Sequence, residues 1–348
     1  MREASSAERR ADLARCEAIL AAGSRSFHAA SRLLPARARK PAVALYAFCR
    51  EADDAVDRDG GPDALARLSL RLDRAYAQRP EDSAVDRAFA AAVASRRIPR
   101  AIPDALIEGF SWDAAGRRYA DYPALEAYAV RVAGSVGLMM ALVMGVREPG
   151  PLARALDLGV AMQLTNVARD VGEDAAMGRL YLPLDWCAEA GLDPDAFLAA
   201  PRFSPELGRV VRRLLTEADR LYARAGHGIA ALPFDCRPAI AAAGGIYAAI
   251  GAEVARAGYD SVSRRAVVGA PAKAWRLAAS LAAVAPRFGA ASAAPAVPSG
   301  AALIAAVAAL GEPSRTDPPR FGERVGGVAE AFARLERRQV AEGVAGRG

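Results

Sequence analysis

Cysteine and histidine are scarce in this chain of 348 residues. The four cysteines stand alone and far apart, so they form neither a Cys-x-x-Cys metal knuckle nor a dense disulfide framework. The two histidines lie in no metal-binding or nucleophile motif. These absences exclude a cysteine or histidine zinc centre and predict reduced, buried thiols. The residues concerned are Cys16, Cys49, Cys187, Cys236, His28 and His227.

Long apolar runs are also missing. The longest near-apolar stretch, residues 132–146, lies between Arg131 and Arg147 and is shorter than the ~20 residues that a membrane-spanning helix needs. We interpret it as a buried helix whose glycines indicate the close approach of another helix or of a ligand. The N-terminal segment lacks the apolar core and cleavage site of a secretory signal, so we expect a cytoplasmic protein.

Alanine is abundant, whereas alternation of β-branched and polar residues is scarce, and this composition predicts an all-α protein. No glycine-rich phosphate loop follows a strand pattern. The net charge of +6 favours anionic partners such as diphosphates or lipid headgroups. The arginines are scattered and do not alternate with aromatic residues, so a nucleic acid partner is not expected.

The positions of proline and glycine, which mark helix ends, predict a single helical domain over residues 1–284. An alanine- and proline-rich linker follows at 285–300, and a poorly specified helical tail at 301–348. An arginine-rich amphipathic helix is expected near 322–341; it packs on the domain or lies on a membrane surface, and packing is the default. The helices expected within the domain end near Gly23, Pro35 and Asp59 or span about 62–78, 82–96, 103–118, 123–146, 152–175, 204–225, 236–257 and 271–284.

Two pairs of aspartates share the same four-residue spacing. Asp53 and Asp57 form one pair, and Asp170 and Asp174 form the other. Residues four apart lie on one face of a helix, so each pair presents two carboxylates side by side. Carboxylate oxygens are ligands that Mg²⁺ prefers, together with the phosphate oxygens of a substrate.

Such pairs are also common on solvated helix faces, where neighbouring cations balance them. The flanking residues argue against that reading, because apolar residues surround both pairs and a polar stripe continues along each helix. Tyr46 and Arg50 extend the first stripe, and Gln163 and Asn166 extend the second. We therefore interpret both pairs as parts of one metal and diphosphate site.

The chain resembles the squalene and phytoene synthase family of head-to-head isoprenoid synthases, most of all its bacterial phytoene-forming members. The resemblance covers roughly residues 14–284 and implies an isoprenoid-synthase helical bundle with a central apolar cavity. The motifs that carry it are SRSFHAASRLLP, ALYAFCREADDAVD, QLTNVARDVGEDAAMGRLYLP and GYDSVSRR.

The resemblance also implies roles for particular residues. Asp53, Asp57, Asn166, Asp170 and Asp174 would hold Mg²⁺, with Mn²⁺ as an alternative. Further residues would line the diphosphate zone or the hydrocarbon cavity. The first group is Arg50, Ser24, Ser26, Tyr46, Gln163, Arg169, Tyr247 and Arg264, and the second is Phe27, Val132, Val136 and Gly137.

The implied reaction joins two geranylgeranyl diphosphates through prephytoene diphosphate to phytoene and releases diphosphate. No dinucleotide fingerprint is present, which favours an outcome without NADPH. The nearest alternative is an enzyme that makes presqualene diphosphate or squalene from farnesyl diphosphate. An alternative of another class is a non-catalytic lipid-binding or assembly factor with the same fold. Because the reactants are lipids, peripheral contact with the inner membrane is a further expectation.

Ser31 bears on the length of the substrate. It lies one helical turn beyond Phe27, where a bulky side chain would shorten a tunnel. A serine leaves that space open by ~5 Å, close to one isoprene unit, and this favours C20 over C15 substrates. The alternative is that Ser31 only caps or packs.

Overall fold

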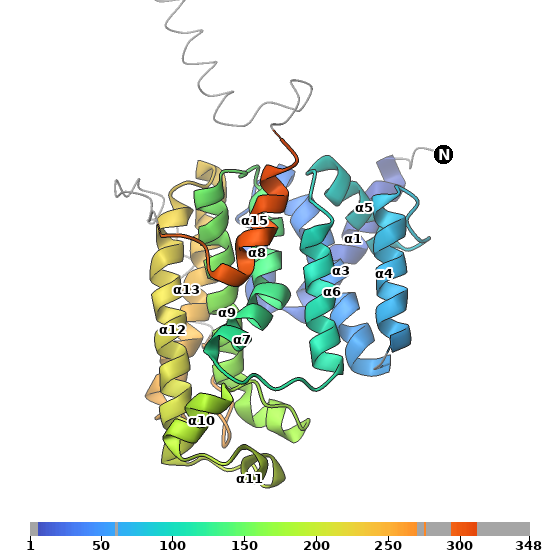
Figure 1. Ribbon diagram of the computed structural model, residues 1–348. Helices are drawn as coiled ribbons and strands as arrows, with labels where there is room; N and C mark the ends of the chain where they lie inside the picture. Colours follow the sequence, from blue (N-terminus) through green and yellow to red (C-terminus); the bar gives the residue numbers. More distant parts are fainter. Residues whose placement is uncertain (1–5, 60–61, 270–274, 276–293, 312–348) are drawn as a thin grey trace, which may run out of the picture. The chain divides into compact units, whose positions relative to one another are not determined.

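The structure is a computed structural model that describes residues 6–59, 62–269, 275 and 294–311. Contacts divide the chain into a compact unit, Met1–Leu310, and a second unit, Gly311–Gly348. Every secondary-structure element in the described residues is helical (Figure 1), which confirms the all-α prediction.

The amino-terminal part of the first unit begins with α1 and the short helix α2. Ser24 caps α2, because its hydroxyl accepts a hydrogen bond from the backbone N–H of Phe27 at 3.2 Å. α3 follows and carries the first aspartate pair at its carboxyl end. The bounds are Ser6–Gly23 for α1, Arg25–Ser31 for α2, Ala36–Asp59 for α3, Pro62–Tyr76 for α4, Ala84–Ser95 for α5 and Ala101–Ala114 for α6.

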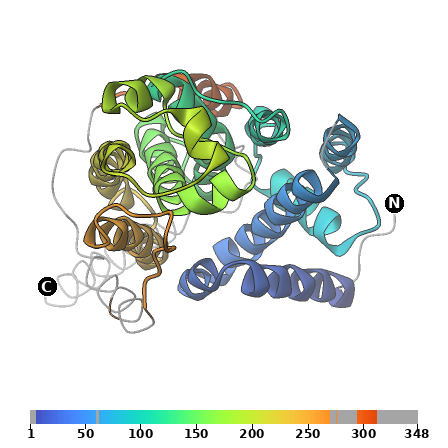
Figure 2. The same ribbon diagram turned by 90° about the horizontal axis from the view of Figure 1, so that it is seen from below.

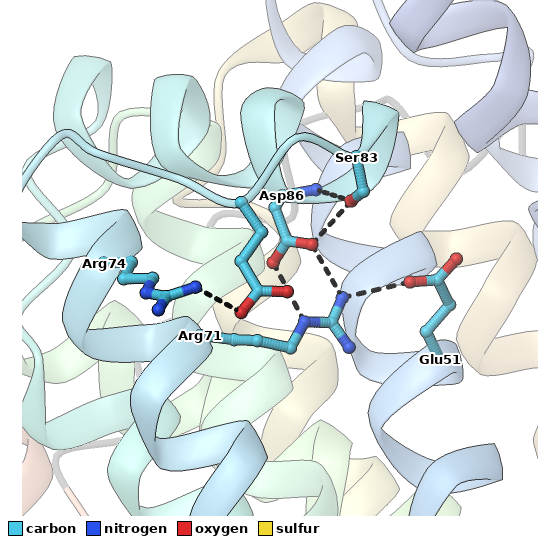
Figure 3. A network of polar contacts seen from close by, with 6 residues as sticks. Glu51, Arg71, Arg74, Ser83 and Asp86 are labelled. Atoms are coloured by element: carbon cyan, nitrogen blue, oxygen red, sulfur yellow. Dashed lines mark hydrogen bonds and ion pairs between the residues drawn. The ribbon is translucent and has the colours of Figure 1, made fainter.

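A partly buried arginine ties α3, α4 and α5 together (Figure 3). Arg71 of α4 donates to both carboxylate oxygens of Asp86 at 3.0 and 3.1 Å, and to Glu51 of α3 at 3.0 Å. Asp86 is almost fully buried and also accepts from Ser83, the residue that caps α5. This pairing compensates the burial of charge and fixes α3, whose carboxyl end carries the site.

The middle of the chain forms one interrupted helical run instead of the continuous helix that we expected over 123–146. It consists of α7 (Tyr122–Ala129), a π-helical segment (Val130–Gly134) and α8 (Ser135–Val143). α8 packs directly on α9 (Pro149–Ala176). A Cβ on Gly137 would lie 2.4 Å from the carbonyl oxygen of Ala155, so the glycine serves close helix packing.

The carboxyl-terminal part surrounds α9. α12 (Pro205–Ile229) and α13 (Arg237–Arg256) both pack against it, and Figure 2 shows these three helices grouped on one side, away from α1 and α3. Two short helices that the sequence analysis missed precede α12. They are α10 (Leu184–Ala190) and α11 (Pro194–Ala199).

Residues 294–308 form a strap across this part of the bundle. A 3₁₀ turn (Pro298–Gly300) and α15 (Ala301–Ala308) pack on α9, and a Cβ on Gly300 would meet Leu156 at 2.4 Å. Buried Arg154 donates to the carbonyl oxygens of Ala294 and Pro295 at 3.0 and 3.3 Å. The strap therefore belongs to the same compact unit as the helices before residue 270.

The expected boundary at 284 and the linker at 285–300 stay predictions, because residues 276–293 lie outside the described part. The helices expected at 271–284 and 322–341 also lie outside it, apart from residue 275. Two described helical stretches, Tyr122–Val143 and Phe234–Arg256, are long and apolar enough to cross a membrane. Both pack against α9 within the bundle, as core helices do.

Candidate active site

A cavity of about 500 Å³ runs through the bundle between α2, α3, α8, α9 and α13. Its wall is mostly apolar, with Leu45, Phe110 and Met162 as examples. One end reaches the polar stripes of α3 and α9, where Asp53 and Asn166 lie. The cavity therefore connects a hydrocarbon-lined interior to a carboxylate-bearing mouth.

The structure brings most of the predicted residues to this cavity. Those that line it are Phe27, Ser31, Tyr46, Arg50, Asp53, Val132, Val136, Gly137, Gln163, Asn166 and Tyr247. The remaining predicted residues lie outside the lining and are Ser24, Ser26, Asp57, Arg169, Asp170, Asp174 and Arg264. Ser24 caps α2, and Arg264 is exposed.

The two aspartate pairs face a common space, although their helices are far apart in the sequence. Arg179, which follows α9, donates to Asp57 of α3 at 3.0 Å. Burial raises the pKa of Asp174, and the charge of the same guanidinium offsets part of that rise. Asp113 of α6 influences the pKa of both Asp53 and Asp174. α3, α6 and α9 thus converge at the mouth of the cavity.

The first pair combines a half-accessible carboxylate with a cation. Asp53 has an accessible side chain, but it borders the cavity, and burial followed by the charge of Asp57 raises the pKa of Asp53 to about 6. Arg50 lies 3.8 Å from Asp53 and 2.8 Å from Asp54. The stronger pairing of Arg50 is with Asp54, so Asp53 keeps acceptor capacity toward the cavity.

Asp170 of the second pair is held by two arginines. Arg169 donates to Asp170 at 2.7 Å, and Arg265 donates to the same carboxylate at 2.9 Å. The loop that carries Arg265 docks on α9 at Gly172, whose N–H donates to the carbonyl oxygen of Ser261 at 3.0 Å. A Cβ on Gly172 would lie 2.8 Å from Val262, so only glycine admits this loop. The arginine of this loop that contacts Asp170 is therefore Arg265. Arg264, which was predicted for the diphosphate zone, is its exposed neighbour.

Asp174 completes this group in an electrostatically unfavourable position. Burial, followed by the charge of Asp170, raises the pKa of Asp174 to about 7. A carboxylate so close to another stabilises a cation placed between them. The raised pKa values of Asp53 and Asp174 identify two positions where positive charge is favoured.

Asp113 is a site residue that the sequence analysis missed. Tyr181 of the GRLYLP loop donates to Asp113 at 2.8 Å, and Tyr128 of α7 donates to it at 3.0 Å. Asp113 lines the cavity, and burial raises its pKa to about 6 although both hydroxyls lower it. It stands alone in the sequence, without an acidic partner four residues away, and so gave no pattern to detect.

Aromatic rings enclose the cavity beside the mouth. Phe27 of α2 stacks on Tyr247 of α13, with ring centroids 5.2 Å apart, and meets the edge of Tyr46 at 6.2 Å. Burial raises the pKa of Tyr247 to about 12, so its hydroxyl stays neutral. Ser31 lines the wall one turn further and donates to the carbonyl oxygen of His28 at 2.8 Å. Its hydroxyl is satisfied locally, and the side chain occupies little of the cavity.

The donor set fits a hard divalent cation. Carboxylates dominate it, and the buried Oδ1 atom of Asn166 has no hydrogen-bond partner, although this residue lines the cavity. Among the described residues, no three acidic, histidine or cysteine side chains are close enough together to enclose an ion. Arginines lie against the carboxylates instead.

The fold and the site define a helical protein with an apolar chamber that opens onto opposed aspartate pairs. A sequence profile of the family described as squalene/phytoene synthase matches residues 20–272. The chain belongs to this family, as its motifs predicted.

Curated relatives agree with this assignment. A phytoene synthase from Rhodobacter capsulatus is 56% identical over 272 residues, which cover 77% of this chain and 80% of the relative. A phytoene synthase from Cereibacter sphaeroides is 54% identical over 267 residues, which cover 74% of this chain and 75% of that protein.

Solved structures share the fold. A crystal structure of a dehydrosqualene synthase in complex with a ligand is similar with a TM-score of 0.74 and 31% identity, covering 79% of this chain and 97% of that one. The squalene synthase HpnC from Alicyclobacillus acidocaldarius has a TM-score of 0.67 at 24% identity, covering 73% and 97%. The predicted isoprenoid-synthase fold is thereby confirmed.

Proposed function

We propose that this protein joins two geranylgeranyl diphosphates head to head and converts the product, prephytoene diphosphate, to phytoene with release of diphosphate. One observation carries the proposal: an apolar cavity ends where two aspartate pairs from α3 and α9 face a common space. The identity of 56% to a phytoene synthase over most of the chain supports the choice within the family.

The first chemical requirement is that the allylic C–O bond break, which happens only if the leaving diphosphate is neutralised. Mg²⁺, or Mn²⁺, would be held by Asp53, Asp57, Asn166, Asp170 and Asp174 and would supply this neutralising charge. Arg50 and Arg169 stand at the same mouth and provide fixed donors for phosphate oxygens. Asp side chains serve here as ligands and not as nucleophiles.

The second requirement is protection of the allylic cation from water. The interior beyond the mouth is lined by Phe27, Val132 and Val136, which offer no nucleophile. Tyr46 and Tyr247 present neutral rings there, since burial raises the pKa of both hydroxyls. The second prenyl double bond is then the nucleophile that attacks. The departing diphosphate is our candidate for the acceptor of the final proton, and no NADPH is expected.

A direct assay tests the proposal. The purified protein is incubated with geranylgeranyl or farnesyl diphosphate, with Mg²⁺ present or chelated and with or without NADPH, and the hydrocarbons are separated by chain length. We expect a C40 triene that requires Mg²⁺ and needs no NADPH. A C30 product alone would contradict the assignment of the substrate.

The substitution Ser31→Phe tests the basis of chain-length selection. A ring at this cavity-lining position fills the space one turn beyond Phe27, so we expect at least a tenfold drop in C40 product relative to C30 product, roughly the discrimination that one pocket-filling group provides. Ala29→Phe, on the same helix but outside the cavity lining, is the control. Full C40 activity in Ser31→Phe would contradict the argument from cavity length.

A C15-specific enzyme that makes presqualene diphosphate or squalene is the second candidate, favoured by the fold match to a dehydrosqualene synthase. A non-catalytic lipid-binding protein with this fold is the third, and it should have lost metal ligands, whereas both aspartate pairs are intact. Diphosphate release that requires Mg²⁺ and disappears in Asp53→Ala excludes the third. A cytoplasmic location stays a prediction.

A further inference from the structure

The cavity runs lengthwise through the bundle, and its two ends carry opposite charge. The aspartates lie at the carboxyl ends of α3 and α9, so the mouth is acidic. The far end is built from the beginnings of α3, α9 and α13 and the ends of α5, α8 and α12, at the top of Figure 1. Leu34, Met144 and Leu232 line the cavity there.

The segments that form this far end are strongly basic. Residues 32–40, 95–98, 144–151 and 228–238 contain many arginines and one lysine, but only two acids, Glu148 and Asp235. Asp235 is engaged by Arg37, which donates to it at 2.6 Å. By composition, these segments therefore contain more cations than acids.

Hydrogen bonds join these cations into one continuous surface. Arg147 donates to the carbonyl oxygen of Arg96 at 2.6 Å, and Arg96 donates to the carbonyl oxygen of Arg37. Burial, and after it the nearby charge of Arg37, lowers the pKa of Arg96. Arg97 donates to the carbonyl oxygen of Leu310 at 2.8 Å, which brings the end of α15 to the same surface.

Two large apolar side chains project from this basic surface. Phe234 is 59% exposed and Leu310 is 37% exposed. Phe234 lies under the guanidinium of Arg237, at 5.8 Å from the ring centroid, and follows Leu232 by two residues. An exposed aromatic residue among cations is the composition that binds the interface of an anionic bilayer, where the ring enters the headgroup layer and the cations meet phosphates.

We propose that this surface, formed by residues 32–40, 95–98, 144–151, 228–238 and Leu310, docks on the anionic face of a lipid bilayer. Docking places the apolar end of the cavity against the membrane and points the acidic mouth away from it. An anionic lipid surface attracts the far end more strongly than the mouth, where arginines already pair with the carboxylates, so the charge distribution favours this orientation. The link between docking and the delivery of lipid substrates rests on the proposed function, whereas docking itself is independent of it.

Vesicle flotation of the full chain tests the surface. Vesicles of phosphatidylcholine with phosphatidylglycerol are compared with vesicles of phosphatidylcholine alone. We expect binding only to the anionic vesicles, and a loss of roughly tenfold in partition for the double variant Lys40→Glu with Phe234→Ser. The matched control is Arg10→Glu with Leu70→Ser, which likewise replaces a cation by Glu and a large apolar side chain by Ser at exposed positions of α1 and α4.

Equal binding to neutral vesicles, or equal losses in the variant and the control, would overturn the proposal. Phe234→Trp and Leu70→Trp provide a second measurement that does not require a variant with reduced stability or membrane binding. Brominated lipids should quench the added fluorescence of Phe234→Trp and leave that of Leu70→Trp unchanged; the reverse result also overturns the proposal. Diphosphate release in detergent, expected to be unchanged in the docking variant, separates failure of docking from failure of the proposed function.

Discussion

Asp113 shows how much of the site depends on single residues that no motif marks. It accepts hydrogen bonds from two tyrosines, one on α7 and one in the loop after α9, and its charge acts on both aspartate pairs. The carboxylate thus fixes the position of the loop that carries Arg179. It also adds a negative charge where metal-bound diphosphate is proposed to lie.

Two substitutions of Asp113 separate these effects. Asp113→Asn keeps an acceptor for one tyrosine and removes the charge, so we expect a stability change within about 1 kcal/mol and a several-fold rise in the Mg²⁺ concentration for half-maximal activity. Asp113→Ala leaves the buried Tyr128 hydroxyl without its acceptor and should cost about 1–3 kcal/mol of unfolding free energy. Denaturant titration and Mg²⁺-dependent diphosphate release are the measurements. An unchanged Mg²⁺ requirement in Asp113→Asn would remove the electrostatic role.

At the scale of elements, close packing against α9 holds the cavity in shape. α8 and the π-helical segment approach α9 at glycines: a Cβ on Gly137 would lie 2.4 Å from the carbonyl oxygen of Ala155, and a Cβ on Gly159 would lie 2.3 Å from that of Ala133. The strap approaches α9 at Gly300, where a Cβ would instead meet the side chain of Leu156. Cavity walls built this way tolerate little displacement, because backbone cannot yield as a side chain does.

Gly300→Val tests whether the strap belongs to the cooperative fold. The added side chain would overlap Leu156, and we expect a loss of about 1–3 kcal/mol in unfolding free energy, typical of an overpacked contact. Gly150→Val is the matched control, because a Cβ at that position meets nothing within 4 Å. Urea titration of both variants compares them. Equal stability of the two variants would show that the strap contributes nothing to folding.

At the scale of the whole molecule, stability and metal binding are linked through pH. Asp53 and Asp174 have pKa values of about 6 and about 7, well above the value near 4 of an unfolded chain. Between roughly pH 4 and 7 the native protein binds more protons than the unfolded one, so the contribution of these groups to unfolding free energy falls as the pH rises. Above about pH 7 the loss is complete.

Mg²⁺ should reverse that loss, because it binds the ionised carboxylates. We therefore expect Mg²⁺ to raise the melting temperature more at about pH 8 than at about pH 5.5. Calorimetry or thermal fluorescence with and without the metal measures the difference. The double variant Asp53→Asn with Asp174→Asn should lose it, and equal increments at both pH values in the unaltered protein would contradict the linkage.

The sequence predicted the local features well and the tertiary ones poorly. The aspartate pairs and the helices that carry them follow from spacing along one chain segment, whereas the cavity residues Phe27 and Val132 were implied by the resemblance to the family. Arg265 and Asp113 reach the site only because a loop docks at Gly172 and α6 lies beside the mouth, and neither event leaves a periodic signal. α10 and α11 were missed because helices of a single turn or two show no amphipathic period.

The guanidiniums resting on Asp57 and Asp170 have one further consequence for the order of events under the proposed reaction. A diphosphate with bound Mg²⁺ would offer the acids a new counter-ion and would offer Arg179 and Arg265 a new anion. Substrate binding would then exchange one set of ion-pair partners for another, and neither the carboxylates nor the guanidiniums would be left without a counter-ion. In the free protein, Arg179 and Arg265 are therefore already positioned, by Asp57 and Asp170, where they can bind the leaving diphosphate.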